Sequence, residues 1–312
     1  MLKNNWKNFC IVGNGHHVAD KIIPALINEK KNILGLVTSK KKEFGFDFAI
    51  FDNISSSLEK LPFNTVYIIA TPPNLHFRQA KEILENKRDV IIEKPIFITL
   101  KEAKEIYLSK DPQNIVLEGF MHKYTRMYLK FMKYWEINKE HIVKLRSEFY
   151  IPEIPKGTFR DGTSISSSCL YDMGCYGLSL LNDIGLNLEK LKVKEFEKIE
   201  SKILKIKLTD IIDNIIIEIN FGKSNSYANF VEITKSDNEK INFSPFFYGR
   251  KAKKSIIHFK NNDIILNKFN DWNAFEKMFS QNLQNLYLNH ENRFKKIFVV
   301  TKKLEELSTA LK

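Results

Sequence analysis

The 312-residue sequence is poor in cysteine, glycine and proline. It has 12 glycines, nine prolines and three cysteines, which are Cys10, Cys169 and Cys175. An odd number of cysteines without a CxxC spacing argues against both a disulfide framework and a zinc site. We therefore expect three small buried cysteines and no metal. The sequence also shows no internal repeat and no long low-complexity linker.

Long apolar segments are absent as well. No stretch of the sequence is long or apolar enough to span a bilayer, and the polar residues 1–7 do not resemble a secretory signal. We therefore expect no membrane partner and a cytoplasmic location. A hydrophobic content of 43% over 312 residues is enough for two cores, so the length permits two domains.

Charge of one sign is in excess. Lysine and arginine number 49 against 37 aspartate and glutamate, which gives a formal net charge of +12. This charge could steer an anionic cofactor or a diphosphate-bearing substrate, or it could reflect lysines spread over solvated faces, which we prefer. The basic run 249–254 is interpreted as a solvated turn, because no nucleic-acid-binding motif accompanies it. No nucleic-acid partner is expected.

The first informative motif follows an apolar strand predicted at residues 8–12. Glycines at this point permit a tight turn and a close approach of the backbone to a pyrophosphate, and the helix predicted at 21–28 would add unpaired N–H groups. Val18 occupies the third glycine position of the dinucleotide-binding motif, so the motif is incomplete. The residues expected to contact the cofactor here are Gly13, Asn14, Gly15, His16 and His17.

The end of the second predicted strand, residues 33–37, bears on the choice of cofactor. An acid at this place would favour a free ribose 2′-hydroxyl, but Ser39 and Lys40 stand there instead. A hydroxyl and a cation suit a 2′-phosphate, so we prefer NADP(H), with NAD(H) as the alternative. A lysine-rich turn in a lysine-rich protein would give the same residues without this meaning.

Further strands are predicted at 49–52 and 65–70, the second of which ends in a proline-rich turn. Thr71, Pro72 and Pro73 are expected to contact the cofactor, and Asn74 is a plausible N-cap for a helix running to residue 86. His76, on the first turn of that helix, could contact the cofactor or pack against the sheet.

The triplet Glu93-Lys94-Pro95 follows the apolar run 89–93, which is predicted to be a buried strand. The carboxyl ends of parallel strands border the ligand crevice of open α/β sheets, so Glu93 and Lys94 are candidate site residues. The ammonium of Lys94 could stabilise a neighbouring anion or polarise a carbonyl. The alternative is an ordinary solvated lysine at the end of a strand.

The second half of the sequence changes pattern. Partial alternation of apolar and polar residues predicts strands at 203–208, 214–222, 227–234, 240–243 and 255–259, followed by helices at 272–288 and 293–311. These strands favour a mainly antiparallel sheet that is covered by helices on one face.

Six separated motifs in this order resemble one family, the glucose-fructose oxidoreductase, inositol dehydrogenase and rhizopine catabolism (Gfo/Idh/MocA) family of NAD(P)-dependent oxidoreductases. The motifs are Gly13-x-Gly15, Ala70–His76, Glu93-Lys94-Pro95, Leu117–Tyr124, Phe149–Arg160 and Cys169–Gly177. The resemblance implies a Rossmann domain with a parallel sheet at 1–119. It further implies an α+β domain at 120–312 with a large open-faced, mainly antiparallel sheet.

The resemblance also implies which residues act. Lys94, Asp172 and Tyr176 would be catalytic, and these three together with Arg160 would bind the substrate. A phenol has a reference pKa of about 10, so a tyrosine proton donor needs a nearby cation, which Lys94 would supply. The family further implies a cis peptide bond between Lys94 and Pro95, and a homodimer or homotetramer formed through the free face of the second sheet.

The tyrosine at 176 and the run 152–160 are most similar to the branch of sugar-nucleotide 3-ketoreductases and dihydrodiol dehydrogenases. One departure is the serine triplet 166–168, where the family usually has glycines, which puts the path of that loop in doubt. The function expected is NADP(H)-dependent reduction of a keto group on a nucleotide-linked sugar. The alternatives are oxidation of a free sugar, polyol or dihydrodiol, and a cofactor-binding regulator without chemistry.

Overall fold

A computed structural model describes residues 6–39, 48–153, 162, 165–200, 202–260, 263–281 and 283–311. The chain forms two compact units. The first comprises the residues up to Met121 together with Phe275–Phe298, and the second comprises His122–Ala274 and the residues from Val299 onward. Phe275–Phe298, which the sequence suggested for the second domain, therefore belongs to the first unit.

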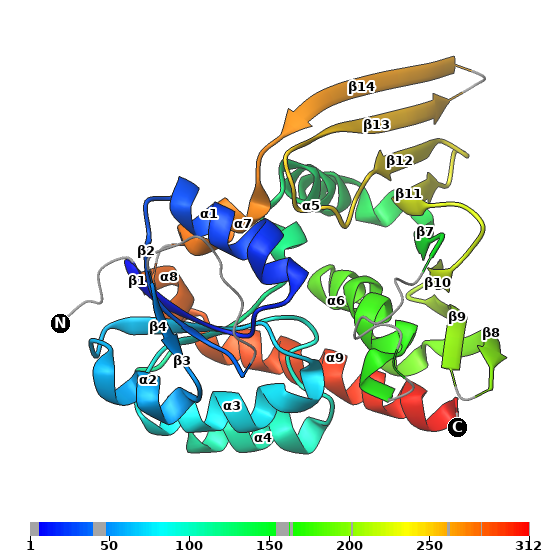
Figure 1. Cartoon of the computed structure of the whole chain (residues 1–312). Helices are drawn as coiled ribbons and strands as arrows, with labels where there is room; N and C mark the ends of the chain where they lie inside the picture. Colours follow the sequence, from blue (N-terminus) through cyan, green and yellow to red (C-terminus); the bar gives the residue numbers. More distant parts are fainter. Residues whose placement is uncertain are drawn as a thin grey trace. The chain divides into compact units, whose positions relative to one another are not determined.

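The first unit contains a six-stranded parallel sheet in the order β3-β2-β1-β4-β5-β6. This is the strand order of dinucleotide-binding folds, in which ligands lie beyond the carboxyl ends of the strands. Its strands are β1 (Asn8–Val12), β2 (Asn32–Val37), β3 (Ala49–Phe51), β4 (Thr65–Ile69), β5 (Val90–Ile92) and β6 (Val116–Glu118). Figure 1 labels β1, β2, β3 and β4 of this sheet.

The central strands of this sheet are buried on both faces. Every residue of β4 and β5 is buried, as expected of parallel strands covered by helices. The core of the unit also takes in Phe294 and Ile297, which lie far away along the chain. The helices of this unit are η1 (Val18–Ile22), α1 (Ile23–Asn28), α2 (Ile54–Lys60), α3 (Pro73–Glu85), α4 (Leu100–Ser109), α7 (Ala274–Phe279), α8 (Leu283–Leu288) and the first part of α9 (His290–Ala310).

Local side-chain bonds fix where several of these helices begin. The Asn53 side chain accepts from the backbone N–H of Ser56 at the start of α2, and Thr99 and Glu102 form a capping box at the start of α4. The prediction for Asn74 is wrong. Helix α3 begins at Pro73 with Pro72 as its N-cap residue, because proline already has the backbone φ that a first helical turn requires.

The second unit contains an eight-stranded sheet in the order β14-β13-β12-β11-β7-β10-β9-β8. Neighbouring strands are antiparallel except β7 and β10, which run parallel. The strands are β7 (Ile142–Ile151), β8 (Lys192–Ile199), β9 (Lys202–Ile212), β10 (Ile215–Lys223), β11 (Ala228–Lys235), β12 (Lys240–Ser244), β13 (Ala252–Lys260) and β14 (Asp263–Asp271). Together the two sheets confirm the predicted fold class.

One face of this sheet is covered and the other is charged. Ile215, Ile217 and Ile219 are buried on β10, whereas Glu218 on the opposite face pairs with Lys144 at 2.9 Å. The helices of the unit are η2 (Met121–Tyr124), α5 (Arg126–Asn138), η3 (Lys139–His141), η5 (Ile165–Ser167), η6 (Leu170–Gly174), α6 (Cys175–Asp183), η7 (Leu188–Lys190) and the second part of α9. The helix predicted from Trp272 begins instead at Ala274.

Cys10, Cys169 and Cys175 are free and buried, as predicted, and burial raises the pKa of Cys10 to about 12. Within the described part of the chain, no helix combines the length and the apolar character needed to cross a membrane.

Asp89 anchors the strand that leads to Glu93 and Lys94. It is almost fully buried just before β5, and it accepts hydrogen bonds from Trp6 Nε1 at 3.0 Å and from the backbone N–H of Ile115 at 2.9 Å. Replacing Asp89 by alanine leaves these two donors without their acceptor. We expect Asp89→Ala to lower the free energy of unfolding by about 2–3 kcal/mol, measured by urea denaturation with tryptophan fluorescence.

The exposed Asp52 provides a matched control for this variant. Asp52→Ala should change the free energy of unfolding by no more than about 0.5 kcal/mol. Equal effects of the two variants would show that the buried hydrogen bonds of Asp89 do not stabilise the protein.

Candidate functional site

The glycine turn lies where β1 ends and the first helix approaches. Gly13 has a φ of +107°, and its N–H donates to Val37 O at 2.9 Å. A Cβ at this position would lie 2.9 Å from Ala70 O, so only glycine fits. Gly15 is exposed, and its carbonyl accepts from the backbone N–H groups of Val18 and Ala19. The turn therefore offers uncovered backbone next to a helix start, which fits a pyrophosphate.

The residues expected to contact the adenosine ribose of the cofactor follow β2, on the same edge of the sheet. β2 ends at Val37, Thr38 is buried and Ser39 is exposed, so the Ser39 hydroxyl is open to a ligand. Lys40 lies outside the described residues. The structure thus places Ser39 at the expected strand end.

His76 contacts the backbone of the proline-rich turn that follows β4. This side chain is completely buried, with Nε2 at 2.9 Å from Thr71 O and Nδ1 at 3.1 Å from Pro95 O. Burial lowers the pKa of His76, although the hydrogen bonds to these carbonyls raise it. A neutral imidazole donates through one nitrogen only, so His76 hydrogen-bonds to one of these carbonyls and packs its other nitrogen against the second, between the turns after β4 and β5. The geometry favours the packing interpretation of His76 over direct contact with a ligand.

Glu93 and Lys94 continue the edge of the sheet after β5. The N–H of Glu93 donates to Ile69 O at 2.9 Å, and the partly buried Lys94 follows. The peptide bond between Lys94 and Pro95 is cis, which confirms what the resemblance implied.

Glu93 binds the helix that follows the glycine turn. Its Oε1 accepts from His17 Nε2 at 2.9 Å, and the side chains of Glu93 and His17 are 12% and 33% exposed. Burial by itself raises the pKa of Glu93, but the neighbouring His17, Lys94 and Lys21 outweigh burial and hold that pKa below its ordinary value. A charged carboxylate therefore ties the glycine turn to the end of β5.

Asp172 and Tyr176 lie in the second unit, on the π-helical turn η6 and on α6, which follows it. Their exposed fractions are 8% and 4%. α6 approaches β10 closely, since a Cβ at Gly177 would lie 2.5 Å from the Ile219 side chain. Asp172 is not an N-cap, because its backbone N–H already bonds to Ser168 O at 3.0 Å within the turn.

The serine triplet before η6 is buried, and Ser167 Oγ donates to Gly162 O at 2.7 Å. Arg160 lies outside the described residues.

The structure therefore gathers the predicted residues in two groups. Within the first unit, the glycine turn, Ser39, the proline-rich turn and Glu93-Lys94 follow the carboxyl ends of β1, β2, β4 and β5. Within the second unit, Asp172 and Tyr176 lie one turn apart. The sequence did not predict the bond between His17 and Glu93, although a histidine after a glycine turn and a buried acid were both visible in it.

The bond between His17 and Glu93 can be tested through acid stability. The depressed pKa of Glu93 stabilises the folded state at neutral pH, and this stabilisation is lost as the pH falls through that pKa. His17→Leu removes the hydrogen-bond donor, so we expect a loss of about 1–3 kcal/mol at pH 7 and an acid limb of the stability curve moved to higher pH. Urea denaturation at a series of pH values measures both effects.

The adjacent His16 is exposed and serves as the control. His16→Leu should leave both the stability at pH 7 and the acid limb unchanged. If the two variants behave alike, the contact with Glu93 has no energetic role.

Comparison with known proteins adds a family and a fold. Residues 7–119 match the GFO_IDH_MocA family model, described as an oxidoreductase family with an NAD-binding Rossmann fold. A search of curated proteins finds no match to the chain.

Solved structures resemble the whole chain. KijD10, a 3-ketoreductase from Actinomadura kijaniata solved with NADP and TDP-benzene, is 15% identical with a TM-score of 0.81, and 98% of each chain is covered. A Gfo/Idh/MocA family oxidoreductase from Vibrio cholerae is 13% identical with a TM-score of 0.73 over 97% of each chain. A dehydrogenase from Chromobacterium violaceum is 14% identical with a TM-score of 0.74, covering 98% of this chain and 96% of that one.

At these identities the solved structures establish the fold alone. Residues 7–119 match the Gfo/Idh/MocA oxidoreductase family with its NAD-binding Rossmann fold, in agreement with the family predicted from the motifs.

Proposed function

We propose that the protein reduces a keto group on a nucleotide-linked sugar with NADPH. The observation that carries the proposal is the likeness in fold, over 98% of both chains, to a 3-ketoreductase solved with NADP and TDP-benzene. Residue types support it, because the chain has a lysine, an aspartate and a tyrosine at the motif positions where the family places its catalytic groups.

The first unit would hold the cofactor. The glycine turn fits the pyrophosphate, and the exposed Ser39 with Lys40 would bind a ribose 2′-phosphate. NADPH supplies the hydride. Glu93 would keep the glycine turn and the end of β5 in one arrangement through its bond to His17.

The proton for the developing alkoxide would come from Tyr176. A phenol is a weak acid, so the positive charge of Lys94 is needed to stabilise the phenolate that forms. Asp172 would accept hydrogen bonds from substrate hydroxyls. These roles come from the residue types and the family resemblance, and Arg160 would complete the set by pairing with a substrate phosphate.

Subunit contacts would form through the open face of the eight-stranded sheet. This face carries paired charges in its middle, such as Lys144 with Glu218, and exposed apolar side chains such as Ile211 and Ile216, which are cross-strand neighbours. Such a mixed surface suits a homodimer or homotetramer.

The substrate class can be tested directly. Purified protein is mixed with NADPH and a panel of 3-keto and 4-keto sugar nucleotides, and the loss of NADPH absorbance is followed. Oxidation of free sugars, polyols or dihydrodiols with NADP⁺ forms the second arm. Turnover only in the second arm would replace the proposed substrate, and tight cofactor binding without turnover in either arm would indicate a regulator.

The role of Tyr176 predicts the behaviour of one variant. Tyr176→Phe keeps the ring and removes the hydroxyl, so kcat should fall by about 10²- to 10⁴-fold while NADPH affinity changes little. Stopped-flow turnover and a fluorescence titration measure the two quantities. Lys94→Ala should lower kcat at least as much. Near-full activity of Tyr176→Phe would mean that the proton comes from another group.

The cofactor preference predicts tighter binding of NADPH than of NADH in the same titration. Ser39→Asp should move the preference toward NADH, because a carboxylate repels a 2′-phosphate and accepts hydrogen bonds from a free 2′-hydroxyl. Asp263→Ala, at an exposed residue of β14 in the second unit, serves as the unaffected control. Equal affinities for NADPH and NADH in the unaltered protein would contradict the proposed NADPH preference.

A further inference from the structure

Tyr176 is surrounded by aromatic rings that the sequence did not associate with it. Its ring centroid lies 5.0 Å from that of His122, 5.4 Å from that of Phe149 and 5.4 Å from that of Phe247. The His122 contact is edge-on, with 61° between the ring planes, and His122 is completely buried. Edge-to-face contacts favour particular ring orientations, so these neighbours restrict how Tyr176 can turn.

Both the ring and the backbone carbonyl of His122 make further contacts. Its ring contacts Phe247 at 5.4 Å and Tyr128 at 5.5 Å, again edge-on. Its carbonyl accepts from the N–H of Thr125 at 3.1 Å and from Thr125 Oγ1 at 2.8 Å. The same Thr125 hydroxyl accepts from the N–H of Tyr128 at 3.0 Å and so caps α5.

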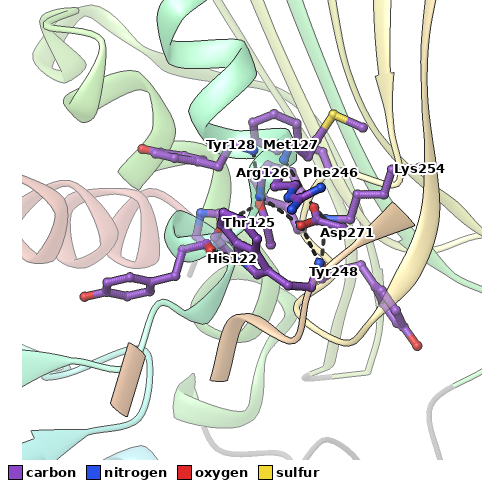
Figure 2. A network of polar contacts seen from close by, with 12 residues as sticks. His122, Thr125, Arg126, Met127, Tyr128, Phe246, Tyr248, Lys254 and Asp271 are labelled. Atoms are coloured by element: carbon purple, nitrogen blue, oxygen red, sulfur yellow. Dashed lines mark hydrogen bonds and ion pairs between the residues drawn. The ribbon is translucent and has the colours of Figure 1, made fainter. Parts of the chain in front are cut away.

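A buried ion pair fixes the start of α5 (Figure 2). Lys254 Nζ lies 3.0 Å from Asp271 Oδ2, and both side chains are 0% exposed. Asp271 also accepts from the N–H groups of Arg126 at 2.9 Å and Met127 at 3.2 Å, while Lys254 donates to Tyr248 O at 2.9 Å. A carboxylate at a helix N-terminus is favourable, and each ion here has further polar partners, as a buried pair requires.

Residues 122–128 also contact the C-terminal end of α6. Lys123 Nζ lies 2.8 Å from Asp183 Oδ2, and the Tyr128 hydroxyl donates to the same carboxylate. Asp183 and Tyr176 are seven residues apart on α6, which is about two helical turns, so they lie on one face. Residues 122–128 thus contact this face of α6 at both of its ends.

From these contacts we propose that His122 is a positioning residue that fixes the orientation of the Tyr176 ring, and with it the direction of the phenolic hydroxyl. The segment that carries His122 is anchored by the buried pair of Lys254 and Asp271 and by the contacts with Asp183. This inference rests on the proposed role of Tyr176 as proton donor.

The test is a double-mutant cycle on the full-length protein with NADPH and its keto-sugar substrate. His122→Leu removes the ring, so kcat should fall by about threefold to tenfold, the range to which aromatic contact energies correspond, with KM and NADPH affinity within about twofold of wild type. His122→Phe keeps an edge-on ring and should restore kcat to within about twofold. In the Tyr176→Phe background, His122→Leu should cause no further fall in kcat, because no hydroxyl remains to be oriented.

His258 provides the control, since its ring lies in the same unit but contacts Tyr134 and Glu239 rather than Tyr176. His258→Leu should leave kcat unchanged. An equal fall in kcat on adding His122→Leu to wild type and to Tyr176→Phe would overturn the positioning role. A wild-type kcat in His122→Leu would overturn it as well.

Three further outcomes are decisive. If His122→Leu does not fold, His122→Phe alone decides, and a fall in kcat of more than tenfold in that folded variant contradicts a role that needs only a ring. If Tyr176→Phe keeps full turnover, the proposed proton donor is wrong and positioning by His122 fails with it. A large loss in Tyr176→Phe combined with an additive cycle leaves the proton donor intact and rejects only the role of His122.

Discussion

A carboxylate removed from water must be met by hydrogen-bond donors, and this constraint organises both units of the protein. Moving an unpaired charge into the interior costs far more than any single contact returns. Asp89, Glu93 and Asp271 meet the requirement with donors from distant parts of the chain. Each of them fastens one end of a strand to another segment of the chain, and the Glu93 junction carries candidate site residues.

The nucleotide-binding half was readily predicted from the sequence. Its central strands β4 and β5 are almost entirely apolar because both of their faces are buried, and glycines and prolines mark strand ends, as at Gly13 and Pro72. The second sheet was harder. β14 was missed because it is an edge strand whose residues 264–266 are exposed on both faces, so no alternation appears. β8 was missed for a similar reason, since nearly all of its residues are exposed.

Candidate site residues were predicted where a motif names them one by one, as with Lys94 and Tyr176. The contacts that these residues make were not predicted, because they join residues that lie far apart in the sequence. Nothing in the local pattern links His17 to Glu93, or His122 to Tyr176. His122 lies within the motif Leu117–Tyr124, but its contact with Tyr176 depends on how η2 and α6 pack together. Such pairings follow from tertiary structure, which periodicity and spacing do not encode.

The presence of Phe294 and Ile297 in the core of the first unit has a consequence for synthesis of the chain. A ribosome adds residues from the N-terminus, so the parallel sheet emerges long before the helix that supplies these two side chains. Until residue 297 has left the exit tunnel, the nascent sheet exposes apolar surface that the finished protein hides, a condition that favours aggregation and chaperone binding. A gene fragment ending near residue 121 would keep that exposure permanently.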